Sequence, residues 1–285
     1  MPELPEVETL RQHLDSVARG FCVQKVLIKK SRIVRPESDR VFKRQLTGQT
    51  IHHIDRRGKF LLMHLNHGSS SHPLVIHLGM SGRLFFRHGF DAIQSIPHLA
   101  VALEGDDRVL CYVDVRAFGR WTFDTSSIDR MGPEPLDADT FHPDYLQQIC
   151  HGRSIKIKDL LMHQERVAGL GNIYVNEVLF LSHLHPSRQA KTIPKRGLTV
   201  LCKAVRSTLS EAIQLGTTSK LDWEGTGHGD GFFYFGRSGQ ADPDMTERFN
   251  VYGREGQPCP RCASPILRMV ISQRGTYYCP KCQLL

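Results

Sequence analysis

Hydrophobic and polar positions follow two different periods along the chain. Between residues 21 and 123, short runs rich in Val, Ile, Leu and Phe alternate with turn residues, which is typical of the strands of a β-sandwich or barrel. From about residue 132 to about residue 215, apolar positions recur at helical spacing, most clearly in LTVLCKAVRSTLSEAI. The pattern therefore predicts an α+β chain of more than one domain, in which a β-sandwich is followed by helices.

The first residues, MPELPEVETLRQHL, predict a helix that begins near Pro5. Val7, Leu10 and Leu14 fall on one helical face, and proline and acidic residues are common in a first helical turn. Pro2 lies before this helix. Because the initiator methionine is usually removed before a small residue, we expect Pro2 to carry the free α-amine of the mature chain.

The chain of 285 residues is basic, with 37 Lys and Arg against 29 Asp and Glu and a formal net charge of +8. Basic residues gather in KKSRIVR, RRGK and RSIKIK and near the carboxyl end, which favours a polyanionic partner, with nucleic acid as the first candidate. The acidic amino terminus and the lack of a long apolar run predict neither a signal peptide nor a membrane span. We therefore expect a cytosolic protein.

Four of the eight cysteines form two Cys-x2-Cys knuckles, CPRC and CPKC. Four thiolates at this spacing can surround one tetrahedral zinc ion, whereas a pair of redox CxxC motifs would need a βαβ context and disulfides an oxidising compartment. The predicted zinc ligands are Cys259, Cys262, Cys279 and Cys282. The remaining cysteines stand singly and are expected to be free thiols: Cys22, Cys111, Cys150 and Cys202.

The segment between the knuckles, ILRMVISQRGTYY, alternates as a β-hairpin does, with Gln273, Arg274 and Gly275 at or near its tip. Spacing alone leaves two interpretations open. Arg274 can be a probe that contacts a nucleic-acid backbone, or it can be a solvated side chain on a purely structural zinc ribbon.

A glycine-containing turn, VAGLGN, lies between two helical stretches within residues 155–186. Gly169 and Gly171 permit backbone angles closed to other residues, and Asn172 can cap a helix that starts at Ile173. With Lys158 nearby, such a helix N-terminus suits an anion such as a phosphate, although a tight structural turn would read the same. Residues 216–246 are then rich in Gly and Asp and predict a long functional loop.

Several motifs occur in a fixed order along the chain: PELPEVET, RRGKFLL, HLGMSGRL, RAFG, GPEPL, VAGLGNIYVNE, VYGREGQPC and CPRC…QRGTYYCPKCQ. In this order they resemble the formamidopyrimidine-DNA glycosylase and endonuclease VIII family of bifunctional DNA glycosylases/AP lyases, and PELPEVET is similar to the formamidopyrimidine-DNA glycosylase branch. The resemblance covers essentially the whole chain. It implies an N-terminal catalytic β-sandwich domain at 1–131, a helix-two-turn-helix domain with a lesion-covering loop at 132–246, and a zinc finger at 247–285.

The resemblance also implies a set of catalytic residues. An α-amine has an ordinary pKa of about 7.7–8.0, so part of the Pro2 amine is uncharged and nucleophilic at neutral pH. Its attack on the C1′ atom of a deoxyribose would give a cationic iminium, which acts as an electron sink for base release and strand cleavage. Glu3 matches the general acid/base, Lys59 the residue that protonates a leaving group or holds the flanking phosphate, and Arg274 an arginine for phosphate binding and the second elimination.

Base excision also implies that the damaged nucleotide leaves the duplex and that the gap is filled. Met80, Arg116 and Phe118 match the void-filling residues of the family. The other DNA contacts implied are His98, Arg153, Lys158 and Asn172. Zinc is the one cofactor, the partner is damaged double-stranded DNA with no membrane, and the protein is expected to be a monomer.

The leading hypothesis is excision of oxidised purines, 8-oxoguanine and formamidopyrimidines, followed by β,δ-elimination. The sequence departs from the family pattern at Ala117, where a second arginine is usual, at His98, which is all that remains of a histidine–aspartate–histidine cluster, and at His163, where an acidic residue is usual. These departures keep two alternatives open: the same chemistry on oxidised pyrimidines, and a non-catalytic protein that binds damaged DNA.

Overall fold

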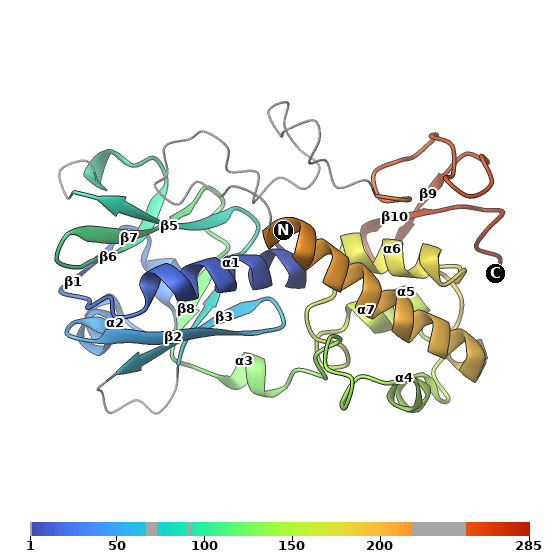
Figure 1. The fold of residues 1–285 in the computed structure, drawn as a ribbon, viewed down its shortest axis with the longest axis horizontal. Coiled ribbons are helices and arrows are strands. Elements are labelled where there is room, and N and C mark those ends of the chain that lie inside the picture. Colours follow the sequence, from blue (N-terminus) through green and yellow to red (C-terminus); the bar gives the residue numbers. More distant parts are fainter. Residues whose placement is uncertain (1, 67–72, 90–92, 218–248) are drawn as a thin grey trace. The chain divides into compact units, whose positions relative to one another are not determined.

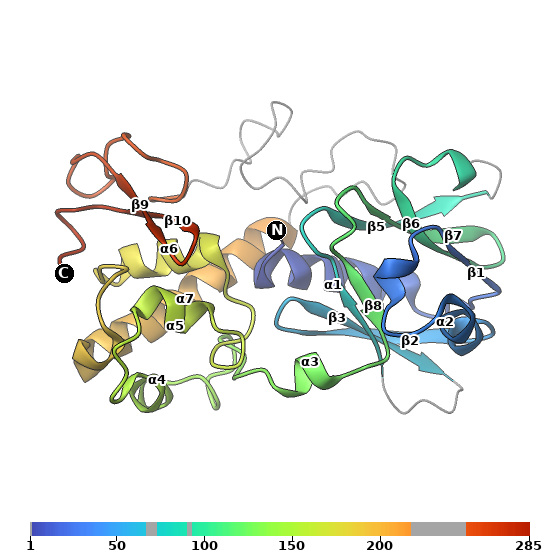
Figure 2. The same ribbon diagram turned by 180° about the vertical axis from the view of Figure 1, so that it is seen from behind.

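The computed structural model describes residues 2–66, 73–89, 93–217 and 249–285. The described residues group into two compact units, each considered by itself (Figures 1 and 2). The first holds the residues up to 129 together with 216 and 217, and the second holds residues 130–215 and 249–285. Most of the loop predicted at 216–246 lies outside the described residues. The division into three domains, 1–131, 132–246 and 247–285, stays a prediction.

The first unit is built on two antiparallel four-stranded sheets, as the alternating pattern predicts. One sheet has the order β1 (Lys25–Ile28), β6 (Leu99–Glu104), β7 (Arg108–Asp114) and β5 (Gly82–His88). The other has the order β2 (Thr50–Arg57), β3 (Phe60–Asn66), β4 (Leu74–His77) and β8 (Arg120–Thr122). One buried cluster draws on both sheets, with Ile54, Leu61 and Trp121 from one and Leu103 and Leu110 from the other. The two sheets therefore share a hydrophobic core.

Helix α1 (Leu4–Ala18) packs along β2 and buries Val7, Leu10 and Leu14 in that core, as their spacing predicts. It begins one residue before Pro5, which lies in the first turn, where its missing N–H and fixed φ cost nothing. The shorter helical elements of the unit are η1 (Ser31–Val34), α2 (Asp39–Leu46), η2 (Ile93–Ser95) and α3 (Ser126–Asp129).

The second unit is helical, with one hairpin. Its elements are α4 (Pro143–Cys150), α5 (Ile157–Met162), α6 (Asn172–Leu181), η3 (Ala190–Thr192), β9 (Leu267–Ile271) and β10 (Arg274–Tyr278), and it holds most of α7 (Lys195–Thr217). Helix α6 packs against both α5 and β10. It begins at Asn172 with Gly171 as its N-cap, one residue earlier than predicted, because the Asn172 side chain bonds elsewhere. Among the helices described, none is long and apolar enough to cross a bilayer.

Candidate catalytic and nucleic-acid-binding site

The amino-terminal end of α1 is fixed by hydrogen bonding around Glu3. The Glu3 backbone N–H donates to Glu6 Oε2 at 2.7 Å, and the acidic Glu6 side chain suits the positive end of the helix. Pro2 is buried, and Glu3 is only 2% exposed. The predicted nucleophile and the predicted acid therefore sit directly before a rigid helix, with little freedom in the backbone that joins them.

Lys59 occupies a tight turn between β2 and β3, in the same unit. The turn consists of Gly58 and Lys59, and the φ of Gly58 is 55°, a value that a side chain disfavours. The Lys59 side chain is buried, with 6% exposed. A lysine in a hairpin turn is usually solvated, and Lys59 differs because it is buried.

A relay of polar contacts ties this turn to α1. Arg56 Nε donates to Glu8 Oε2 at 2.8 Å, and Arg56 Nη1 donates to the Gly58 carbonyl at 3.0 Å. Burial alone would raise the pKa of Glu8, but hydrogen bonds from Arg11, Gln12 and Arg56 outweigh it and lower that pKa. Glu8 is therefore held as a carboxylate, and it fixes the turn of Lys59 relative to the helix that follows Pro2 and Glu3.

His77, at the end of β4, is a site residue that the sequence analysis missed. Burial, reinforced by the positive charges of Lys59 and Arg120, lowers the pKa of His77 to about 4. Its Nδ1 accepts the Gly79 N–H at 3.1 Å, which assigns the proton of the neutral ring to Nε2. In the sequence, His77 could have been noticed as a histidine at the end of an apolar strand, two residues before Gly79. His77 therefore presents an uncharged N–H donor near Lys59.

This histidine should make folding sensitive to acid. Between pH 6.5 and 4 the unfolded chain binds a proton at His77 that the folded chain does not, so stability falls as the pH drops. The shift predicts a loss of about 2 kcal/mol between pH 7.5 and pH 5 from this residue. Urea unfolding of the wild type and of His77→Gln at both pH values gives the free energy of unfolding of each protein. The contribution of His77 is the loss of that free energy in the wild type minus the loss in the variant. An equal acid loss in both would contradict the assignment.

Two loops that carry predicted void-filling residues are fastened together by Asp114. The fully buried carboxylate accepts hydrogen bonds from Ser81 Oγ at 2.6 Å and from the Gly119 N–H at 2.8 Å. Ser81 Oγ in turn accepts the Arg116 N–H at 3.1 Å. The β4–β5 loop and the β7–β8 loop therefore share one anchor. Asp114 also went unnoticed in the sequence, because its partners lie in another loop.

Met80 and Phe118 stand out from these loops. A Cβ at Gly79 would lie 2.7 Å from the carbonyl carbon of Phe118, so glycine is needed for the loops to approach this closely. Met80 is 43% and Phe118 49% exposed, large fractions for apolar side chains. The Arg116 guanidinium lies 4.9 Å from the centre of the Phe118 ring. The structure thus brings the three predicted residues together at one surface.

Two further positions flank this surface. Ala117, where the sequence departs from the family pattern, has a φ of 51°, a left-handed conformation that alanine disfavours. His98 is exposed, has a φ of 58°, and its carbonyl accepts the Asp114 N–H at 3.1 Å. His98 is therefore joined through its backbone to the strand end that holds both loops.

In the second unit, Lys158 and Asn172 converge on the finger hairpin. Lys158 Nζ donates to the Gly275 carbonyl at 3.2 Å and to Thr276 Oγ1 at 2.6 Å, and Asn172 Nδ2 donates to the same carbonyl at 3.0 Å. Lys158 is fully buried. Its ammonium group and the Asn172 amide thus hold the backbone next to Arg274, whose side chain is exposed.

The hairpin itself agrees with the predicted alternation. Its turn is formed by Ser272 and Gln273, whose φ values of 47° and 62° match the left-handed angles of a type I′ turn. Arg274 is the first residue of β10, directly after the turn. Arg153, the remaining predicted contact of this unit, lies before α5 with its side chain exposed and its backbone bonded to Cys150 and Lys191.

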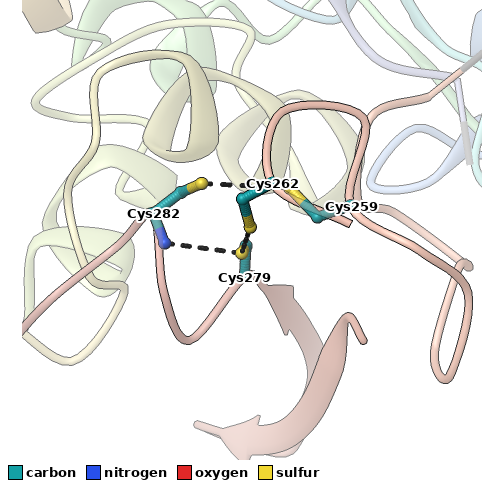
Figure 3. A group of neighbouring side chains, drawn as sticks. All are labelled: Cys259, Cys262, Cys279 and Cys282. Atoms are coloured by element: carbon teal, nitrogen blue, oxygen red, sulfur yellow. Dashed lines mark hydrogen bonds between the residues drawn. The ribbon is translucent and has the colours of Figure 1, made fainter. Parts of the chain in front are cut away.

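The four predicted zinc ligands gather at the base of the hairpin (Figure 3). Their Sγ atoms all lie within 4.8 Å of one another, with Cys259–Cys282 at 3.9 Å and Cys262–Cys279 at 3.4 Å. A tetrahedral zinc ion with Zn–S bonds of about 2.3 Å needs sulfur atoms about 3.8 Å apart. The donor set and its spacing therefore fit one zinc ion.

The four clustered thiols differ in how readily they lose a proton. Hydrogen bonds with Ser264 lower the pKa of Cys262 to about 6, whereas burial and the neighbouring thiols raise the pKa of Cys282 to about 12. A divalent cation at the centre stabilises the thiolate form of every ligand.

Glu177 fastens the segment that leads into the finger, a role that the sequence analysis missed. Its carboxylate accepts the backbone N–H groups of Asn250, Val251 and Tyr252 at 2.8–2.9 Å. One residue earlier on α6, Asn176 Oδ1 accepts the Tyr277 N–H at 2.8 Å. Helix α6 therefore supports the finger at both its entry segment and its hairpin.

Models of known protein families match most of this chain. Three family models match: the formamidopyrimidine-DNA glycosylase N-terminal domain at residues 1–121, the formamidopyrimidine-DNA glycosylase H2TH domain at 131–222, and the zinc finger found in FPG and IleRS at 256–284. With this finger identified, the four cysteines are the ligands of a single zinc ion.

Relatives and solved structures agree over the full length. Formamidopyrimidine-DNA glycosylases of Enterococcus faecalis and Bacillus cereus are 38% and 36% identical, covering 100% and 99% of this chain and 98% and 99% of their own. Among solved structures, a Lactococcus lactis FPG mutant with Fapy-dG containing DNA has a TM-score of 0.84 at 32% identity, covering 99% of both chains. A MutM complex with carbocyclic 8-oxo-G containing DNA has the same TM-score and identity, covering 100% of both chains. The chain belongs to the formamidopyrimidine-DNA glycosylase family.

Proposed function

We propose that this protein is a bifunctional DNA glycosylase/AP lyase of base excision repair that removes oxidised purines. The observation that carries the proposal is the placement of Pro2 and Glu3 at the fixed start of α1, with the Lys59 turn tied to that helix through Glu8 and Arg56. The solved relatives bind DNA that contains Fapy-dG, carbocyclic 8-oxo-G or an abasic site. Their ligands support oxidised purines as the substrate class.

The chemistry begins at the Pro2 nitrogen, once Met1 has been removed. The uncharged secondary amine attacks C1′ of the damaged nucleotide, the bond from C1′ to the base breaks, and the base leaves with a proton from an acidic group of the site. The attacking nitrogen gives up its proton, and its lone pair then breaks the bond from C1′ to the ring oxygen O4′, which takes up a proton as the sugar opens. The product is an iminium that has no N–H proton to lose and therefore stays cationic. That charge acidifies the C2′ proton, whose removal expels the 3′ phosphate; loss of a C4′ proton then expels the 5′ phosphate.

We assign the proton transfers to Glu3 and Lys59. Glu3 follows the nucleophile directly and is almost completely buried, which suits a general acid/base. Lys59 protonates a leaving group or holds the flanking phosphate, and the neutral ring of His77 beside it adds no competing positive charge. In this proposal His77 is a positioning residue for Lys59.

Extrusion of the nucleotide is assigned to the surface that Asp114 holds together. Met80 and Phe118 offer apolar wedges, and Arg116 offers a guanidinium to the orphaned base. Asn172 and Arg274 would contact phosphates, with Arg153 and His98 as further backbone contacts. Lys158 is assigned to phosphate binding only through the hairpin that it supports, because its ammonium group is buried against Gly275 and Thr276.

Salt dependence separates a phosphate contact from a positioning residue. Each neutralised phosphate contributes about 0.9 to the slope of log K against log salt for duplex DNA. We expect Arg274→Ala to lower the slope by about that amount, and Lys158→Met to weaken binding several-fold with the slope unchanged. Fluorescence anisotropy with an abasic duplex at several salt concentrations measures both. A slope reduced equally by Lys158→Met would make Lys158 a direct contact.

Borohydride trapping on an abasic duplex tests the proposed function. An enzyme of this class gives a covalent protein–DNA adduct, whereas a non-catalytic damage-binding protein gives none. Comparing base release from 8-oxoguanine paired with cytosine and from a thymine-glycol duplex then decides the substrate. Faster release of the pyrimidine lesion would favour the alternative left open by Ala117 and His98. We place this activity in the cytoplasm, at the nucleoid, in a monomeric protein.

A further inference from the structure

A group of ligand-type side chains lies on the β2–β3 ribbon, away from the residues assigned above. His53 and Asp55 belong to β2, and His64 belongs to β3 directly opposite His53. The neighbouring pair, Ile54 and Met63, is buried in the core. Because side chains alternate along strands, His53, Asp55 and His64 share the opposite, partly exposed face.

The three side chains approach one another at the spacing of metal ligands. Nε2 of His53 and Nε2 of His64 each lie 3.3 Å from Asp55 Oδ2, and all three ligand atoms lie within 4.8 Å of one another. Bonds of about 2.0–2.1 Å from zinc to nitrogen and oxygen give tetrahedral edges of about 3.3–3.4 Å. The two His–Asp distances therefore equal the edges of a zinc tetrahedron, and rotation of the stacked His53 and His64 rings, whose planes lie 7° apart, would bring both Nε2 lone pairs onto one ion.

His52 supplies the support that a metal-bound histidine needs. A register shift between Ile51 and His53 marks a β-bulge at His52. Its Nδ1 lies 2.7 Å from Nδ1 of His53, so one of these nitrogens carries a proton and the other accepts it. When Nδ1 of His53 donates, its Nε2 is free to bind a metal ion, which is the usual arrangement of a ligating histidine.

We propose that His53, Asp55 and His64 form a second metal site, which binds one divalent transition-metal ion of the zinc class. Two imidazoles and one carboxylate form a donor set that suits Zn²⁺ and neighbouring ions and is too nitrogen-rich for Mg²⁺ or Ca²⁺. The side chains of His53, Asp55 and His64 are 32%, 56% and 33% exposed, so an ion can enter from solvent. The site is separate from the four cysteines and from the Lys59 turn.

Calorimetric titration of the full-length protein, with its finger already loaded with zinc, tests this site with Zn²⁺ alone. We expect one further equivalent to bind with a Kd on the order of 1–10 µM. Asp55→Asn and His64→Ala should each weaken it at least tenfold, and His52→Ala about tenfold through loss of the supporting hydrogen bond. His88→Ala is the matched control, because His88 is an exposed histidine of the same unit at the end of β5. It should leave the Kd unchanged.

Co²⁺ added to the same zinc-loaded protein identifies the ligands by absorption. Nitrogen and oxygen ligands give weak visible bands that should disappear in His64→Ala, whereas entry into the finger gives intense thiolate-to-cobalt charge transfer. No second equivalent of Zn²⁺, cobalt binding confined to the cysteines, or equal weakening by His88→Ala would each overturn the proposal.

Discussion

Replacing the amino-terminal proline, Pro2→Gly, is expected to lower base release and strand cleavage at least about 100-fold while duplex binding changes little. Glycine offers a primary amine, and its Schiff base carries a positive charge only when protonated, so the electron sink that drives both steps is weakened. Glycine also loosens the backbone directly before Glu3. Single-turnover assays on an 8-oxoguanine duplex, with anisotropy for binding, measure the two effects.

Retention of the initiator methionine is the matched comparison for this variant. A protein that keeps Met1 has every side chain in place but a blocked Pro2 nitrogen, so borohydride should trap no adduct with it. Mass spectrometry of the reduced adduct should place the cross-link on Pro2 in the wild type. Trapping at another residue, or equal trapping with Met1 retained, would remove Pro2 from the mechanism.

Loss of one zinc ligand, Cys262→Ser, is expected to have the second large effect. Three thiolates bind zinc far more weakly than four, and the hairpin that carries Arg274 has its base at this site. We expect the zinc content to fall from one ion per chain towards zero and the affinity for an abasic duplex to fall at least tenfold. Metal analysis and anisotropy measure these outcomes.

Cys22→Ser is the control for that variant. Cys22 is a partly exposed free cysteine of the first unit. Its replacement by serine should change neither zinc content nor DNA affinity. Unchanged zinc content in Cys262→Ser would contradict the assignment of the finger ligands. Lost zinc with unchanged DNA affinity would instead separate the finger from DNA binding.

Local periodicity was sufficient for the elements of the fold. The spacing of Val7, Leu10 and Leu14 predicted α1, and the alternation between residues 21 and 123 predicted the sandwich, because each pattern records which side of one element is buried. The zinc ligands could also be predicted from the sequence, because two short motifs carry all four thiols.

The supporting roles within the site could not be found in this way, although Lys158 itself was predicted as a phosphate contact. Lys158 reaches the Gly275 carbonyl across 117 positions of sequence, and Asp114 joins loops whose contact only the folded sandwich creates. A buried lysine and a buried aspartate look like solvated charges in the sequence. His77 is similar, because its neutrality comes from burial and from the charge of Lys59.

The finger hairpin and the segment that leads into it depend on hydrogen bonds from α6. This dependence limits which parts of the protein can be exchanged with those of another protein. Asn172, Asn176 and Glu177 sit on the helix, yet each bonds to backbone atoms of residues 250–277. A chimaera that transplants only the carboxyl-terminal segment into another scaffold would leave behind the partners of those backbone atoms. A transplanted finger keeps these hydrogen bonds only if α6 is transplanted with it. The smallest unit that can be exchanged is therefore α6 together with the carboxyl-terminal segment.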